Sequence, residues 1–158
     1  MYEVVGGTLL HAFYGYAGIG KGLNNPADNF VSGVGPLPVG TYTIGKEQNF
    51  TFKEGKKTIH LEGAMRLTPN PSNRMGKRFG FLIHGSKGDH MKDSSNGCIV
   101  LEPSKHRNVI GTSGDRTLHV FSGESNPQTP SGTNSSFRDI EQTLNAESEL
   151  CTERGICK

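Results

Sequence analysis

The chain of 158 residues contains no tryptophan, and only 32% of its residues are hydrophobic. A chain of this length still buries about two-thirds of its unfolded surface when it folds, so we expect a modest, aliphatic core. No stretch approaches the ~20 apolar residues that a membrane-spanning helix needs. The sequence therefore predicts one folded domain with an extension and no membrane span.

Concentrated positive charge is also absent. The formal net charge is +2, and residues of both signs are interspersed along the chain. A protein that binds nucleic acid would show a basic patch or stripe, so this balance argues against a nucleic-acid partner.

The N-terminus lacks the features of a secretory signal. The first residues, M-Y-E-V-V-G-G, include neither a basic start nor an apolar stretch of about 7–15 residues. We expect a protein that stays in the cytosol, or that leaves by a route needing no such signal, or whose signal has been removed.

Cysteine is scarce, and the three cysteines fall into two groups. Cys98 stands alone in mid-chain, and an odd thiol is a candidate for reactivity. Cys151 and Cys157 form a C-x5-C arrangement near the C-terminus. They could close a disulfide loop in an oxidising compartment, or they could remain two reduced thiols.

Glycine, in contrast, is abundant. The 22 glycines are roughly twice the usual ~7% share, which favours tight turns and short strands over long helices. We therefore expect a mainly β fold. Strands are predicted at residues 2–14, 41–44, 49–53, 57–62, 79–84, 98–101 and 117–121, a short helix at 103–110, and loops at 15–26 and 66–78.

The composition changes after residue 121. Residues 122–136 are rich in Ser, Gly, Pro and Asn, which is typical of a linker. Beyond them, Phe137, Ile140 and Leu144 recur at helical spacing. We predict a domain over 1–121, a linker over 122–136, and a short amphipathic helix with the C-x5-C tail over 137–158, which either packs on the domain or docks a partner.

Two segments carry residue types suited to nucleophilic catalysis: F-L-I-H-G-S at 81–86 and S-S-N-G-C-I-V at 94–100. A thiol attacks as thiolate and needs a nearby base or positive charge. His84 ends an apolar strand, and the following loop can return Cys98 to it. We predict Cys98 as nucleophile and His84 as base, with His90 as the alternative base.

The residues around this pair have predicted supporting roles. A tight turn before Cys98 can aim backbone N–H groups at one point, as an oxyanion hole requires. The imidazole could be oriented by a backbone carbonyl near Ser86 or by Asp89, and the sequence does not choose. The supporting residues are Ser95, Asn96, Gly97 and Ser86.

The same segments resemble the catalytic domain of the L,D-transpeptidases, whose signature is I-H-G followed later by S-H-G-C-I-R. Residues 83–85 match the first part, and Ser95-x-Gly97-Cys98-Ile99 matches the second. The runs G-K-G at 20–22, N-N-P at 24–26 and V-G-P-L-P-V-G-T-Y at 34–42 are similar to the branch formed by type VI secretion effectors that target peptidoglycan. The resemblance covers about residues 8–121.

The resemblance implies a small β-sandwich-like domain without cofactor or metal, acting on peptidoglycan stem peptides. Cys98 would attack the bond between diaminopimelate and the fourth-position D-Ala and form an acyl-enzyme. Water would then give L,D-carboxypeptidase action, a D-amino acid would give exchange, and a second stem would give a crosslink. The implied partners are the secretion machinery and a cognate immunity protein. The implied place of action is the target-cell periplasm, where a Cys151–Cys157 disulfide would fit.

Two positions depart from the L,D-transpeptidase signature. Asn96 stands where the signature has His, and Val100 stands where it has Arg. Because this arginine is missing, the sequence does not identify the residue that anchors the substrate. The candidates are Arg66, Arg74, Arg78 and Arg107.

Three other interpretations stay open. The first is a metal site built from His84, His90, Cys98 and His106, although their spacing matches no common zinc pattern. The second is a cell-wall-binding module without catalysis. The third is a housekeeping L,D-transpeptidase that makes crosslinks.

Overall fold

The computed structural model describes residues 1–5, 8–86 and 95–122. Residues Met1–Ser122 form one compact unit. The predictions for Asp89, His90, the C-terminal helix, Cys151 and Cys157, and for nearly all of the linker, lie outside the described residues.

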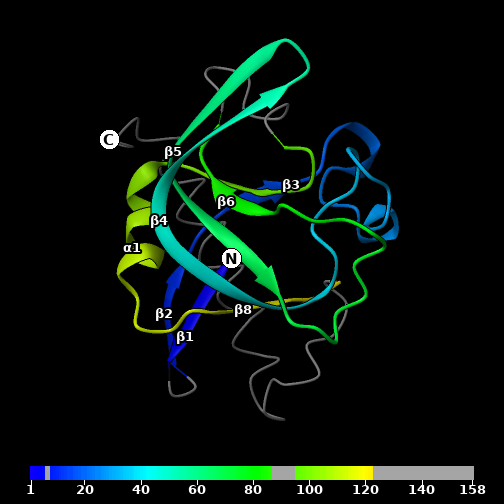
Figure 1. Ribbon diagram of the computed structural model, residues 1–158. Coiled ribbons are helices and arrows are strands. Elements are labelled where there is room, and N and C mark those ends of the chain that lie inside the picture. The colour runs from blue at the N-terminus through cyan, green and yellow to red at the C-terminus, as the bar shows by residue number, and fades with distance from the viewer. Residues whose placement is uncertain (6–7, 87–94, 123–158) are drawn as a thin grey trace, which may run out of the picture. The chain divides into compact units, whose positions relative to one another are not determined.

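The prediction of a mainly β domain is confirmed. The described part of the chain forms short strands, one long hairpin and one short α-helix (Figure 1). In chain order the elements are β1 (Tyr2–Val5), β2 (Thr8–Ala12), β3 (Gly15–Ala17), the 3-10 turns η1 (Gly20–Gly22) and η2 (Pro26–Asp28), β4 (Gly40–Glu54), β5 (Lys57–Pro69), β6 (Leu82–His84), β7 (Ile99–Leu101), α1 (Ser104–Thr112) and β8 (Thr117–Val120). None of the described helices has the length and apolar character to cross a membrane.

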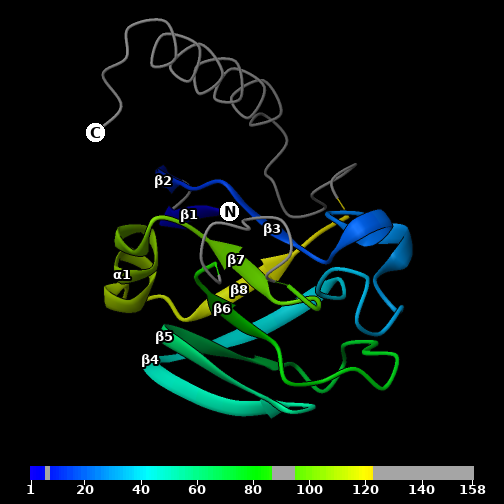
Figure 2. The same cartoon turned by 90° about the horizontal axis from the view of Figure 1, so that it is seen from above.

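The strands form two sheets. β1 and β2 pair in a two-stranded sheet, and the others form a six-stranded sheet in the order β3-β7-β6-β5-β4-β8. Its neighbours pair antiparallel except β6 and β7, which are parallel. Figure 2 shows β4 and β5 curving along one side of this sheet, with α1 at its flank.

The β4–β5 hairpin is the largest element, and it corrects two predictions. The strands predicted at 41–44 and 49–53 are one strand, β4, with register shifts on either side of Gln48. The loop predicted at 66–78 begins only after Pro69, since Leu67 is buried and pairs with Ile44. The loop was predicted from the Arg, Pro and Asn residues of this segment, but its first residues continue a strand whose alternate side chains face the core.

The Gly-rich segment predicted as an irregular loop is partly a strand. β3 pairs with β7 through Tyr16 and Val100. A Cβ at Gly15 would lie 2.7 Å from the Val100 carbonyl oxygen, so only glycine fits this approach. The segment is therefore part of the sheet beside the predicted cysteine strand.

Tyr42 explains the spacing of the G-P-L-P-V-G-T-Y run. Its ring is buried, and its hydroxyl donates a hydrogen bond to the Pro38 carbonyl at 2.7 Å. Burial raises the pKa of Tyr42 to about 12, so the hydroxyl keeps the proton that it donates. This bond fixes the rigid turn at 35–40 against the core.

We expect Tyr42→Phe to lower the free energy of unfolding by about 1–3 kcal/mol, because it leaves the Pro38 carbonyl without this donor. Urea denaturation of the purified protein measures the loss. Tyr14→Phe is the matched control, because Tyr14 is 63% exposed and its hydroxyl remains in water. Equal stability of the two variants would contradict this role of Tyr42.

Candidate active site

The parallel pair of β6 and β7 places His84 and Cys98 on one face of the sheet. Ile83 pairs with Ile99, and His84 pairs with Val100, so Leu82 and Cys98 share the adjoining register position. Paired residues of neighbouring strands lie on the same face, with the strands about 4.8 Å apart and a rise of about 3.3 Å per residue along each strand. Cys98 directly precedes β7, so continuing the register places it diagonally across from His84, within reach of an imidazole and a thiol.

A backbone carbonyl fixes the tautomer of His84. The His84 ring is 2% exposed, and its Nδ1 lies 2.6 Å from the Gly85 carbonyl oxygen. A carbonyl can only accept, so Nδ1 carries the proton and the neutral ring has its lone pair on Nε2. The sequence left two candidates for the group that orients the imidazole, a backbone carbonyl near Ser86 and Asp89. Among the described residues, the Gly85 carbonyl is the group that holds the ring.

The segment after His84 is fixed by an ion pair. The Ser86 N–H donates to Glu102 Oε1 at 2.7 Å, and Glu102 Oε2 lies 3.2 Å from Nη1 of Arg107. A Cβ at Gly85 would lie 2.5 Å from Glu102 Oε1. The glycine of the I-H-G run is therefore required because the Glu102 carboxylate packs on its backbone.

Ser95 holds the turn that precedes the cysteine. Its hydroxyl donates to the Cys98 carbonyl at 2.6 Å and accepts from the N–H groups of Gly97 and Gly18 at 3.0 and 3.1 Å. The side chain is 1% exposed, so its one donor and two acceptor positions are all filled inside the protein. The Gly97 N–H is thus engaged within the turn, and Ser95 ties the turn to the Gly-rich segment.

Arg78 is the residue that joins the segments around Cys98. It is 8% exposed, and its guanidinium donates to four carbonyl groups. One belongs to Asn96 in the cysteine turn, at 3.2 Å. The other three belong to the segment before β4, namely Asn29, Pro36 at 2.6 Å and Gly35 at 2.9 Å.

The charge of Arg78 acts on the thiol as well as on the backbone. Burial lowers the pKa of Arg78, and coulombic interactions with Cys98 and Tyr42 oppose that shift. A guanidinium that interacts with a thiol favours its thiolate form. The sequence indicates Arg78 only as a candidate substrate anchor, and its sole signal is its place next to the apolar strand that ends in His84.

Gly97 is where Arg78 meets the turn. Its φ is +121°, which side chains rarely adopt, and a Cβ there would lie 2.1 Å from Nη2 of Arg78. The neighbouring Asn96 side chain donates to Glu54 Oε1 at 2.8 Å, so the tip of the β4–β5 hairpin reaches the same turn. Three of the predicted supporting residues, Ser95, Asn96 and Gly97, therefore build the turn.

The described candidates for the anchoring arginine differ in their surroundings. Val100 is 1% exposed and points into the domain. Arg107 is buried and donates to the carbonyls of Leu101 and Gly63 at 2.7 and 3.3 Å. Arg66 is exposed, with its guanidinium 5.0 Å from the centre of the Phe50 ring.

The metal interpretation has no support among the described residues. His106 lies on α1, where its ring is 4.7 Å from that of Phe13. Within the part of the chain that the structure describes, no group of three or more His, Cys, Asp or Glu side chains is placed to hold an ion. His90 lies outside that part.

We expect Gly97→Ala to disrupt the site, because the methyl group collides with the Arg78 guanidinium in a strained backbone conformation. Gly55→Ala is the matched control, since Gly55 also has a positive φ, of +61°, but nothing lies within 4 Å of its Cβ position. The control should lose only about 1–2 kcal/mol of unfolding free energy. Urea denaturation and the rate of Cys98 alkylation measure both variants, and equal losses would contradict the packing argument.

Comparison with known proteins gives one family match. Residues 11–122 match the model of the Tlde1 domain. Searches of curated proteins and of solved structures find no match. The matched span contains both halves of the site, from the Gly-rich segment to β8. The chain therefore belongs to the Tlde1 domain family, a family of type VI secretion effectors.

Proposed function

We propose that this protein is an antibacterial effector that acts on peptidoglycan stem peptides through a Cys98 acyl-enzyme. It cleaves the bond between diaminopimelate and D-Ala, exchanges the D-Ala for another D-amino acid, or does both. The observation that carries the proposal is the placement of His84 and Cys98 on one sheet face, with His84 Nδ1 engaged by a carbonyl. This is the nucleophile, base and orienting group that acyl transfer requires.

In the first step the Cys98 thiolate attacks the carbonyl carbon at the L-centre of diaminopimelate. The Arg78 charge favours the thiolate, and His84 carries the second proton on Nε2 as an imidazolium. When the tetrahedral intermediate collapses, the C–N bond breaks and Nε2 gives its proton to the leaving D-Ala amine. The product is a thioester on Cys98, with free D-Ala released.

In the second step the neutral His84 acts as base. Nε2 takes a proton from water or from the amine of an incoming D-amino acid, and that nucleophile attacks the thioester. The C–S bond breaks and the thiolate returns. Water gives a tripeptide stem, whereas an amine gives a stem with a new fourth residue.

Delivery by the type VI machinery would bring the enzyme to the periplasm of a neighbouring cell, where stem peptides are exposed. Trimmed or exchanged stems are poor substrates for crosslinking, so the wall would weaken. A producing cell needs protection from its own enzyme, and the proposed partner is a cognate immunity protein that blocks the site.

The test is incubation of purified wild type, Cys98→Ala and His84→Ala with tetrapeptide muropeptides, with and without an added D-amino acid such as D-Met. We expect wild type alone to release D-Ala or replace it, read by mass spectrometry. Loss of the nucleophile or base should lower the rate by at least roughly 100-fold. Lys105→Ala, an exposed change on α1, is the control and should match wild type.

The product ratio distinguishes hydrolysis from exchange. If wild type leaves every stem unchanged but still binds intact sacculi, the protein is a cell-wall-binding module. If Cys98→Ala keeps wild-type turnover, the acyl-enzyme proposal is wrong.

A further inference from the structure

The sheet register places one exposed arginine on the same face as the catalytic pair. Arg66 on β5 pairs with Leu82 on β6, and Leu82 adjoins Cys98 because Ile83 pairs with Ile99. Arg66, Leu82 and Cys98 therefore form a row across three strands. The two strand spacings of about 4.8 Å put the Arg66 and Cys98 backbones ~10 Å apart.

His84 lies between the two ends of this row. It is two residues beyond Leu82 on the same face, so it is a diagonal neighbour of Arg66 on one side and of Cys98 on the other. Packing supports this assignment, since Leu82 and Ala64 share one apolar cluster with Leu61, and Cys98 and Phe50 pack against it. The strand positions of His84, Cys98 and Arg66 thus surround that of Leu82.

Arg66 has a charge that the described protein does not neutralise. Its guanidinium lies over the Phe50 ring at 5.0 Å, which orients it by a cation–π contact. Among the residues that the structure describes, no carboxylate forms an ion pair with it. The guanidinium is therefore held in place and its donors face solvent.

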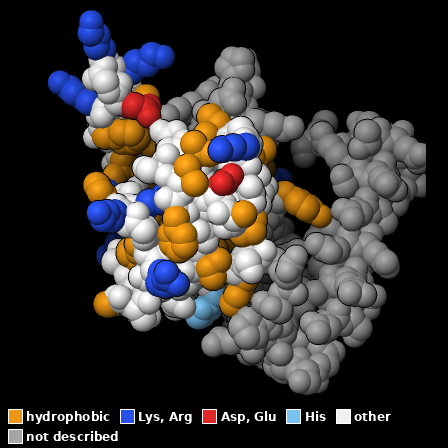
Figure 3. Space-filling model, turned by 90° about the vertical axis from the view of Figure 1, so that its right-hand side faces the viewer, with side chains coloured by type: hydrophobic (Ala, Val, Ile, Leu, Met, Phe, Trp, Pro, Cys, Tyr) orange, Lys and Arg blue, Asp and Glu red, His pale blue; other side chains and the backbone are white. Residues whose placement is uncertain are grey.

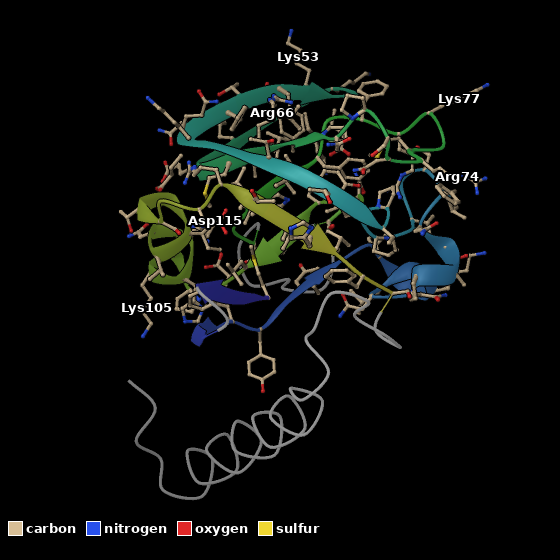
Figure 4. The ribbon with its side chains drawn as sticks, turned by 90° about the horizontal axis from the view of Figure 1, so that it is seen from below. Lys53, Arg66, Arg74, Lys77, Lys105 and Asp115 are labelled. Carbon is tan, nitrogen blue, oxygen red and sulfur yellow. The ribbon has the colours of Figure 1, made fainter. Side chains whose placement is uncertain are left out.

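The other basic side chains near the site differ from Arg66. Arg78 and Arg107 donate to backbone carbonyls inside the domain. Arg74 and Lys77 point outward from the loop that follows β5 (Figure 4). Lys53 lies at the tip of the hairpin, whose projecting lysines are seen in Figure 3. Unlike Arg74, Lys77 and Lys53, Arg66 therefore occupies a strand position on the face that carries His84 and Cys98.

We propose that Arg66 binds a substrate carboxylate beside the scissile amide and so sets the enzyme's specificity for acidic stem termini. This inference rests on the proposed function. An extended peptide advances ~3.3–3.6 Å per residue, so a carboxylate one residue from a carbonyl at Cys98 falls within reach of an arginine whose backbone is ~10 Å away. A guanidinium can hold a carboxylate through two parallel hydrogen bonds.

Two carboxylates of the stem lie close enough to the scissile bond. One is the C-terminal carboxylate of the leaving D-Ala, and the other is the side-chain carboxylate of diaminopimelate. The test therefore uses three tetrapeptide stems: the free acid, the C-terminal amide and the diaminopimelate side-chain amide. The enzymes are wild type, Arg66→Met, Arg66→Lys and, as the matched control, Arg74→Met.

We expect wild type to prefer the free acid over one of the amides by about 10- to 100-fold in kcat/KM. Arg66→Met should lose that preference, with a similar fall on the free acid and little change on the discriminated amide. Arg66→Lys should recover part of the preference, and Arg74→Met should behave as wild type. The amide that wild type discriminates against identifies the carboxylate.

The outcomes separate this inference from the proposed function. If wild type turns over the stems and Arg66→Met keeps the wild-type preference, or loses rate equally on all three, the inference is wrong and the function stands. If wild type turns over none of them, the function and the inference fall together. The unfolding midpoint of Arg66→Met should lie close to that of wild type, because only the cation–π contact of an exposed side chain is lost.

Discussion

The Arg78 guanidinium is a buried charge, and the segments around the site are arranged to accept its hydrogen bonds. A charge removed from water is costly unless it is paired or hydrogen-bonded. Here carbonyls of Asn29, Gly35, Pro36 and Asn96 receive it. The segment before β4 and the cysteine turn are distant in sequence, and this one group holds both. In the proposed function, the thiolate of Cys98 is the negative charge that this guanidinium stabilises.

The parallel pairing of β6 and β7 supplies the other constraint. These strands have three residues each, yet their register decides which side chains share a face. His84 and Cys98 share a sheet face because of it, and the antiparallel pairing of β5 with β6 places Arg66 on the same face. The glycines of the two motifs are then explained by contact: Gly85 lies against the Glu102 carboxylate, and Gly97 lies against Arg78.

Much of this arrangement could be predicted from local sequence. The mainly β class followed from glycine content, and the two sides of the hairpin tip were predicted as strands at 49–53 and 57–62. Cys98 and His84 were found from residue type and flanking motif, and their catalytic roles remain predictions. The role of Arg78 could not be predicted, because its partners are backbone carbonyls. Every residue has such a carbonyl, so residue types do not show which ones Arg78 contacts. The reach of β5 to Pro69 and the position of Arg66 beside the site depend on strand register, which is set by tertiary pairing.

The most direct test is the rate of Cys98 alkylation by iodoacetamide over a series of pH values. Peptide-level mass spectrometry separates Cys98 from Cys151 and Cys157. The variants are Arg78→Met, Arg78→Lys and Arg116→Met, the last because Arg116 also donates to backbone carbonyls, those of Ile110, Gly111 and Gly45. The account predicts that Arg78→Met slows alkylation near neutral pH by on the order of tenfold and that Arg78→Lys slows it less. Arg116→Met should keep the wild-type profile. A wild-type profile in Arg78→Met would contradict the account, because Cys98 would then be reactive without the charge that the fold places beside it.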